Sequence, residues 1–457
     1  MNHNRIVKIV LSGLLMAACG RAGAQSRKIE LADFQKLVRV SDPQISPDGK
    51  SIVAVVSRVN WDEDRRDSSL LIVEIATGAQ RNLTNVHKGL GSPKWSPSGD
   101  RIAYLATVGV GKEAEEQIHV LPMNGGEARQ ITTASRGVEQ FAWRPNGSDI
   151  AFVSPDEPAN KKEIEKHNDA FEVGDNDFLA TAAPTASHIW LVSADGGTAT
   201  RLTSGTWSLT KSAPPSPPSS PLSWSPDGKQ IAFARQADPH YGDSDQTVVA
   251  ILDVASGEIR QLTKRTSYEG FGLFSPDGSK IAYWFPRDGD PNNETEIYVA
   301  SSSGGEGTDL TRAIDRDIQR AIWMPDGKSL LVSGHDGTRT AMWIQPLAGP
   351  AKKLDLGDAN PAWIFWVDAF VGNNGAIAFT GSTPTHPSEL YYIASADAKA
   401  RRLTDFNHEI AALDLARTET FKWQGPDKFA EDGIVLHPPG FDRSKKYPLV
   451  VYIHGGP

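Results

Sequence analysis

The chain of 457 residues contains a single cysteine, Cys19, in its apolar N-terminal segment. Downstream of it, cysteine is therefore excluded as a nucleophile, a disulfide partner or a metal ligand. The net charge is −9 and no basic block stands out, which argues against nucleic acid as a partner. Long hydrophobic runs are absent too: residues 9–18 are too few to span a bilayer as a permanent helix, so we expect no transmembrane segment.

The N-terminus has the pattern of an export signal. Arg5 and Lys8 precede the short apolar run, and Ala22-Gly23-Ala24 fits a small-x-small cleavage site. We therefore predict a signal peptide over residues 1–24 and a periplasmic or secreted mature chain. Residues 16–19, Met-Ala-Ala-Cys, loosely resemble a bacterial lipoprotein box, which usually has Leu at the first position, so a lipid anchor on Cys19 stays open.

Familiar catalytic signatures are missing as well. The sequence contains no G-x-S-x-G nucleophile elbow and no H-E-x-x-H or H-x-x-E-H spacing. We therefore expect no metal site and no cofactor, and we assign no member of a catalytic triad to this chain.

What the chain does contain is a repeat that occurs seven times. An apolar residue precedes Ser-Pro-Asp-Gly or a variant of it, and two or three apolar residues follow. Pro presets the turn, Asp bonds to the local backbone and Gly adopts a positive φ, so each copy predicts a hairpin. The copies begin at Ser46, Ser96, Arg144, Ser225, Ser275, Met324 and Gly372, and successive starts differ by 50, 48, 81, 50, 49 and 48 residues.

A second motif follows each copy, a short apolar strand, a turn of small residues and then Leu-Thr or a similar pair, as in residues 118–132 and 297–311. Units of this size with only strand signals must stack on copies of themselves to bury both faces. We expect tryptophans beside the turns to fill the layers between sheets: Trp95, Trp143, Trp224 and Trp323. The prediction is an all-β, seven-bladed β-propeller over residues 25–415. The longest interval places an insertion near residues 155–183, with a helical start at residues 161–166.

The last forty residues have a different character. Residues 447–453 form an apolar, β-branched and aromatic run that predicts a strand, and His454-Gly455-Gly456-Pro457 follows at once. The stretch from Pro438 through Lys445-Lys446-Tyr447-Pro448 into this ending resembles the entry to the catalytic domain of the prolyl oligopeptidase family of serine peptidases. It is most similar to the acylaminoacyl-peptidase and bacterial dipeptidyl-peptidase branch, as is the phrase at residues 40–50.

The resemblance implies that residues 416–457 begin a truncated α/β-hydrolase domain. The family cleaves peptides or acyl-peptides by acyl transfer to a serine that a histidine activates and an aspartate orients. The elbow, the aspartate and the histidine follow the oxyanion loop in this fold, so they would lie beyond Pro457. His454, Gly455 and Gly456 would then shape the oxyanion loop and not the triad.

Dipeptidyl branches of the family hold the substrate's free amine with glutamates from a propeller insertion, and charge pairing suits that role. The insertion here offers Asp169, Glu172 and Asp175, of which Glu172 and Asp169 are our candidates. The alternative for Glu172 is a solvated surface helix.

A free-standing periplasmic propeller of the Tol type is the alternative for the whole chain. A propeller lactonase would need clustered metal carboxylates, which we do not identify. Substrate preference, entry path and oligomeric state stay open.

Overall fold

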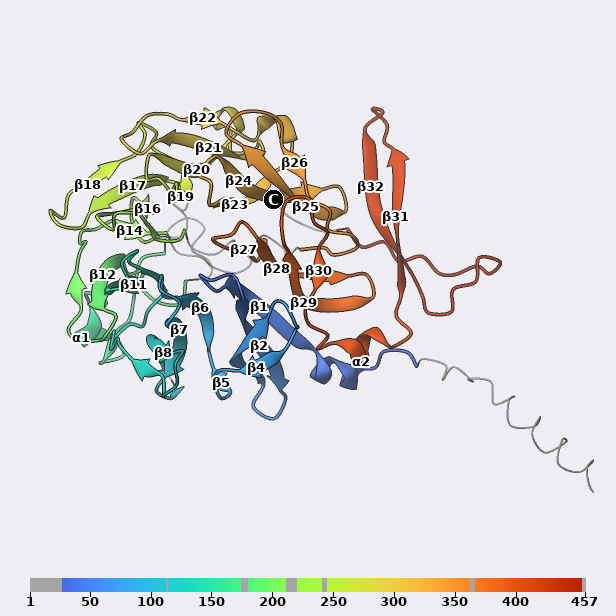
Figure 1. The fold of residues 1–457 in the computed structure, drawn as a ribbon, viewed down its shortest axis with the longest axis horizontal. Coiled ribbons are helices and arrows are strands. Elements are labelled where there is room, and N and C mark those ends of the chain that lie inside the picture. The colour runs from blue at the N-terminus through green and yellow to red at the C-terminus, as the bar shows by residue number, and fades with distance from the viewer. Residues whose placement is uncertain are drawn as a thin grey trace, which may run out of the picture.

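The computed structural model describes residues 27–111, 114–173, 180–210, 220–240, 245–361 and 366–453, so the predicted signal peptide and Cys19 lie outside the described residues. Seven antiparallel sheets are arranged as a ring of blades (Figure 1), which confirms the predicted seven-bladed propeller. In the described part of the chain, no helix combines the length and the apolar character needed to cross a membrane.

Each blade takes its strands from one continuous stretch of chain. Blade 1 contains β1 (Val38–Ile45), β2 (Ser51–Asn60), β3 (Arg65–Glu74), β4 (Gln80–Asn82) and β5 (His87–Lys88). Blade 2 contains β6 (Gly91–Trp95), β7 (Arg101–Val108), β8 (Glu115–Pro122) and β9 (Arg129–Gln130). Blade 3 contains β10 (Gln140–Trp143), β11 (Asp149–Pro155), β12 (Ser187–Ser193) and β13 (Thr200–Arg201). Blade 4 contains β14 (Ser208–Leu209), β15 (Ser223–Trp224), β16 (Gln230–Gln236), β17 (Thr247–Asp253) and β18 (Ile259–Gln261).

The last three blades follow the same order. Blade 5 contains β19 (Gly270–Phe274), β20 (Lys280–Pro286), β21 (Thr295–Ser301) and β22 (Thr308–Asp309). Blade 6 contains β23 (Ile318–Trp323), β24 (Ser329–Asp336), β25 (Arg339–Pro346) and β26 (Lys352–Lys353). Blade 7 contains β27 (Ala369–Val371), β28 (Ile377–Thr383), β29 (His386–Ile393) and β30 (Arg401–Arg402). The short helices are η1 (Leu31–Lys36), α1 (Lys161–Ile164), η4 (Arg287–Gly289), η5 (Arg312–Ile314) and α2 (His408–Ala411).

The Ser-Pro-Asp-Gly copies form the predicted turns between the first two strands of a blade. In blade 1 the Ser46 hydroxyl donates to Asp48 Oδ1 at 2.6 Å and accepts the Ser51 N–H at 3.0 Å, while Gly49 takes a φ of +72°. Blades 4 and 5 repeat this pattern with Ser225 and Ser275. The threonine of the second motif also bonds to the backbone: in blade 2, Thr132 Oγ1 accepts the Ile118 N–H at 2.9 Å.

The predicted tryptophans do lie between blades, and each also donates a hydrogen bond. Nε1 of Trp143 reaches the Lys94 carbonyl of the preceding blade at 3.0 Å, and Nε1 of Trp323 reaches the Leu273 carbonyl at 2.9 Å. Trp95 and Trp224 make the equivalent bonds at 3.1 and 3.3 Å. Apolar clusters fill the layers between neighbouring blades, so the core is a series of layers around a central channel.

Blades 1 and 7 meet without sharing a strand. The seam between them is packed by an apolar cluster that includes Val40, Ile52, Ala378 and Leu390. Polar contacts reinforce it: Asn407 Oδ1 accepts the Val38 N–H at 3.0 Å, and Asn407 Nδ2 donates to the Val38 carbonyl at 2.9 Å. Side chains therefore close the seam among the described residues, and the Asp414 N–H adds a backbone hydrogen bond to the Arg27 carbonyl at 2.9 Å.

Candidate functional site

The two faces of the ring are formed by different turns and loops. Inner strands end in the Ser-Pro-Asp-Gly turns, which form one face. The opposite face, which we call the connection face, carries the crossings from one blade to the next and the loops between the second and third strands. By this strand order, the insertion between β11 and β12 lies on the connection face. The chain also leaves the last blade on this face, after β30.

The insertion contains both predicted amine-binding residues. Its helix α1 covers Lys161–Ile164 and is shorter than the predicted residues 161–166. Asp169 and Glu172 follow it in an irregular stretch, and both are exposed. The third residue considered, Asp175, lies outside the described residues.

The predicted oxyanion loop, His454, Gly455 and Gly456, also lies outside the described residues. The prediction of a strand at residues 447–453 is wrong: the structure has no strand there, and Leu449 and Tyr452 are 83% and 89% exposed. A strand needs a neighbour to accept and donate its ladder hydrogen bonds. Within the described chain no strand pairs with this run.

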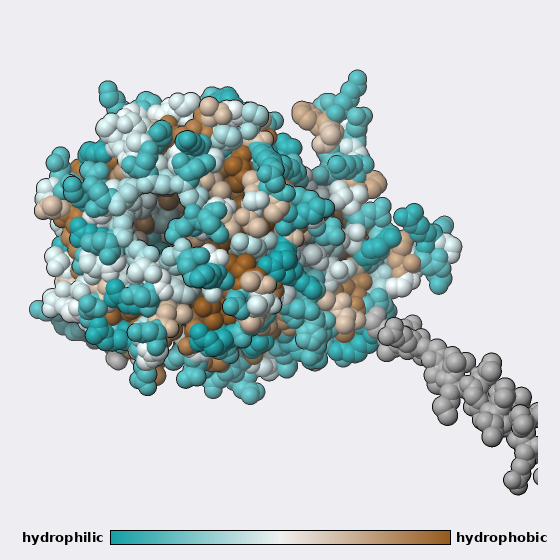
Figure 2. Space-filling model, in the orientation of Figure 1, coloured by the Kyte–Doolittle hydropathy of each residue, from teal (hydrophilic) through white to brown (hydrophobic). Residues whose placement is uncertain are grey.

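A two-stranded hairpin of β31 (Arg417–Gln424) and β32 (Ala430–His437) precedes that run. It stands apart from the ring in Figures 1 and 2 and forms a sheet of its own. Large apolar side chains are exposed on both faces, including Phe421, Trp423, Ile434 and Leu436 at 41–65%. Isolated hairpins are at best marginally stable, and exposed apolar surface on this scale marks an interaction site.

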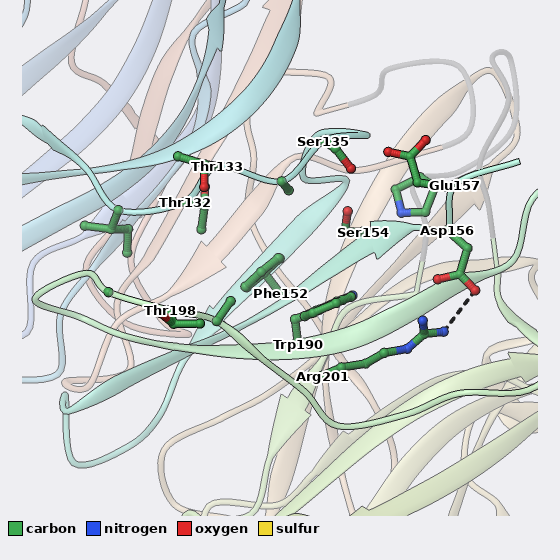
Figure 3. A pocket seen from close by; sticks show the side chains of 15 residues that line it. Thr132, Thr133, Ser135, Phe152, Ser154, Asp156, Glu157, Trp190, Thr198 and Arg201 are labelled. Carbon is green, nitrogen blue, oxygen red and sulfur yellow. Dashed lines mark hydrogen bonds and ion pairs between the residues drawn. The ribbon is translucent and has the colours of Figure 1, made fainter. Parts of the chain in front are cut away.

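A groove of about 740 Å³ lies between the outer parts of blades 2 and 3, at the base of the insertion (Figure 3). Phe152 and Trp190 stack at a ring distance of 6.4 Å and line its middle. At one end Arg201 donates to Asp156 Oδ2 at 2.9 Å, and the same guanidinium lies 5.6 Å from the Trp190 ring. The groove has the size of a small-molecule site.

The charges of this groove are largely neutralised within the protein. Asp156 pairs with Arg201 and lies 3.7 Å from the buried His188, and Glu157 lies 3.3 Å from Lys161. Burial lowers the pKa of His188 despite the attraction of Asp156. The groove therefore offers apolar and hydroxyl surface more than an unpaired charge.

A second candidate lies in the wall of the central channel. Four inner strands deviate from regular pairing, at Ser41/Gln44, Gly91/Lys94, Gly270/Leu273 and Ile318/Arg320. Bulges redirect side chains. At or within them lie Asp42, Lys94, Phe271 and Arg320; Asp42 and Phe271 adopt left-handed backbones with a φ of +53°.

Asp42, Lys94, Arg320 and Asp368 form no direct ion pair with one another, although their charges affect each other. The Asp42 N–H donates to Asp368 Oδ2 at 2.8 Å across the seam, and burial, followed by the charge of Asp42, raises the pKa of Asp368 to about 7. Burial lowers the pKa of Lys94 to about 8 and that of Arg320 to about 10. All four residues are half-buried.

His386, Glu389 and Asp405 bring possible metal-ligand atoms within 4.8 Å of one another. Glu389 already accepts from Thr404 Oγ1 and from the Asn407 backbone, and Arg402 lies 3.2 Å from Asp405. The equivalent buried Glu296 in blade 5 is paired with Arg287 at 2.6 Å. His386 thus lies beside Glu389 in blade 7 as Arg287 lies beside Glu296 in blade 5. The cluster therefore fits a structural hydrogen-bond network.

No family model matches the sequence. Dipeptidyl-peptidase 5 of Porphyromonas gingivalis is 27% identical over 93% of this chain and 63% of its own length. The uncharacterized peptidase YuxL of Bacillus subtilis is 27% identical over 93% of this chain and 66% of its own length. The chain is a homologue of these peptidases. The resemblance predicted from the sequence is thereby confirmed, and the chain spans less than two thirds of the length of either relative.

Solved structures agree with the fold. Acylaminoacyl peptidase of Pyrococcus horikoshii matches 89% of this chain and 59% of its own, with a TM-score of 0.65 and 17% identity. The β-propeller domain of the trilobed protease of Pyrococcus furiosus, described as having an open velcro topology, matches 82% of this chain and 98% of its own. Its TM-score is 0.57 and its identity 17%.

The sequence reasoning missed the channel residues. Asp42, Lys94 and Arg320 come from three blades, Asp368 precedes blade 7, and together they form no local motif. A usable signal was present, because Lys94 and Arg320 are charged residues in the same short strands as the layer residues Trp95 and Trp323.

Proposed function

We propose that this chain is the substrate-gating propeller, with the beginning of the catalytic domain, of an exported serine peptidase that cleaves peptides or acyl-peptides. The observation that carries the proposal is the exposed apolar surface of β31, β32 and residues 447–453, next to a ring of seven blades. Such surface fits the first strands of a domain whose remaining strands cover it. The peptidase relatives, of which the chain spans 63% and 66%, support the same reading.

The Ser-His-Asp triad would lie beyond Pro457 under this proposal, and the ring would restrict access to short substrates. The alternative, a free-standing Tol-type propeller, leaves the apolar hairpin without a role. An uncovered strand edge and apolar face favour aggregation, which makes that alternative less economical.

The coding DNA downstream of Pro457 provides the test. We expect an in-frame continuation of about 200 residues, a typical domain size, with a G-x-S-x-G motif near its start. A fluorophosphonate probe should label the longer protein and not the 457-residue chain. A stop codon directly after Pro457 in independent isolates would contradict the proposal. So would turnover of a chromogenic dipeptide by the 457-residue chain that a serine-directed inhibitor blocks.

We further propose that Glu172 and Asp169 bind the free amine of the substrate. Their support is that they are exposed carboxylates on the connection face, where the chain also leaves the last blade. In the longer protein, E172Q and D169N should raise KM for a dipeptide substrate with a free N-terminus, while E165Q, an exposed control in the same insertion, should not. An equal effect on the N-acetylated substrate would exclude amine binding.

A further inference from the structure

The channel wall contains a guanidinium surrounded by aromatic rings. The Arg320 Cζ lies 4.1 Å from the centre of the Trp366 ring. Phe271 lies 5.2 Å from Trp366 and stacks on Trp284 at 3.9 Å, and the Trp284 and Trp366 rings are 6.2 Å apart. We call Arg320, Trp366, Phe271 and Trp284 the Arg320 cluster. Blades 5 and 6 supply three of its members, and Trp366 precedes blade 7.

The positive charge of Arg320 is not neutralised by an ion pair among the described residues. Its Nη2 donates to the Ala369 carbonyl at 3.4 Å, which is a long bond, and its buried Nε has no acceptor in the described part of the chain. The Trp284 Nε1 in the same cluster is also buried and has no acceptor among the residues that the structure describes. A buried donor left unpaired is unfavourable and uncommon in native proteins, so the cluster has surplus donor capacity.

The electrostatic surroundings add to that surplus. Lys94, from blade 2, is close enough for its charge to act on that of Arg320, and it too lacks an ion pair among the described residues. The opposing groups are the seam carboxyls Asp42 and Asp368. Burial raises the pKa of both carboxyls, that of Asp368 to about 7, and so disfavours their charged forms.

Access to the cluster comes from its place in the strands. Phe271 and Arg320 lie in the first halves of β19 and β23, nearer the connection face than the turn face. Arg320, Trp284 and Trp366 are only partly buried. A ligand in the channel can therefore approach from the face on which the insertion lies.

From these observations we infer that the Arg320 cluster binds the free α-carboxylate of a peptide whose last side chain is aromatic or large and apolar. The guanidinium supplies the charge-assisted hydrogen bonds and the three rings supply the apolar contact. The inference deepens the proposed function and rests on it for the substrate class.

Binding to the 457-residue chain itself tests the inference, so failure of the peptidase proposal would not decide the result. N-acetyl-L-phenylalanine and its amide differ only in the carboxylate. By calorimetry the acid should bind at least 10-fold more tightly than the amide. R320Q should remove that preference and leave the affinity for the amide unchanged.

The matched control is R101Q, because Arg101 also lies against a tryptophan, 5.3 Å from the Trp143 ring, but is ion-paired with Asp195. It should leave both affinities unchanged. Should R320Q fail to fold, W366L tests the apolar part: it should weaken the acid and the amide equally, and N-acetylglycine should bind wild type more weakly than N-acetyl-L-phenylalanine. Equal affinity for acid and amide, no binding of the acid at millimolar concentration, or an unchanged preference in R320Q would overturn the assignment.

Discussion

The Asn407 side chain pairs with both backbone groups of Val38, from which it is separated by 369 residues. Its Oδ1 accepts the Val38 N–H at 3.0 Å and its Nδ2 donates to the Val38 carbonyl at 2.9 Å. One buried amide thereby imitates the hydrogen bonding of a neighbouring strand. The same Nδ2 also contacts Glu389 Oε1 at 3.1 Å, which fixes its orientation.

The first prediction concerns this contact. N407A leaves two buried backbone groups of Val38 unpaired, and each such group costs about 1–3 kcal/mol. We expect the free energy of unfolding in urea to fall by at least about 2 kcal/mol. N373A is the control, because exposed Asn373 makes one long seam bond to Pro47. Equal effects of the two variants would show that Asn407 does not hold the seam.

A second prediction uses the Asp42–Asp368 pair. The pKa of Asp368 is raised to about 7 in the folded protein, compared with about 3.9 for an unperturbed aspartate. Between pH 4 and 7 the folded state thus holds more protons than the unfolded state, and this pair's contribution to stability is lost as pH rises. D368N keeps an acceptor for the Asp42 N–H but cannot ionise.

Thermal unfolding at pH 5 and pH 8 measures the effect. The Tm of D368N relative to wild type should be higher at pH 8 than at pH 5. D195N, at a side chain that is 85% exposed, should show the same difference from wild type at both values. A pH-independent difference for D368N would mean that the pair does not titrate in this range.

A third prediction concerns the buried carboxylate of blade 5. Glu296 is fully buried and accepts from Arg287 at 2.6 and 2.8 Å. R287M leaves this charge uncompensated, so the free energy of unfolding should fall by about 3 kcal/mol. Blade 2 has Gln117 at the equivalent place, hydrogen-bonded to Thr132 at 2.8 Å.

The blade 2 arrangement suggests the rescue. The double variant R287M/E296Q should be more stable in urea than R287M alone, because an amide needs no counter-charge. R312M removes a guanidinium that is 49% exposed from its ion pairs with Asp288 and Asp309 and should change stability by less than about 1 kcal/mol. Additive losses in the double variant would contradict the account.

The fourth prediction concerns the hairpin. Deleting residues 417–457 removes Phe421, Trp423, Ile434 and Leu436 together with the exposed run after residue 447. We expect the shortened chain to remain soluble at higher concentration, as measured by light scattering, with an unchanged Tm. Lower solubility or a lower Tm would mean that the tail packs on the propeller.

Local patterns were readable in advance, because each repeat carries its own turn chemistry. The Ser46 and Ser275 turns, the Thr132 bond and the layer position of Trp143 follow from short motifs. Contacts between residues far apart in the sequence could not be predicted. Asn407 and Val38 meet only because the ring closes, and Arg320 meets Trp366 because blade 6 packs beside the segment that leads into blade 7. No spacing in the sequence expresses either contact. Residues 447–453 show the converse, since strand propensity without a neighbouring strand yields no strand.

The pairing of Asn407 with Val38 also constrains the order of assembly. The last strand of blade 1 ends at residue 88. The residues of blade 7 that pack on it, and Asn407, which bonds to Val38, come more than 280 residues later in the chain. The apolar face of blade 1 that packs on blade 7 therefore stays uncovered until the ribosome has synthesised blade 7. Non-local contacts of this kind slow folding and lengthen exposure to aggregation. Ring closure is thus expected to be the last event of folding, and chaperones that cover the side of blade 1 would act before it.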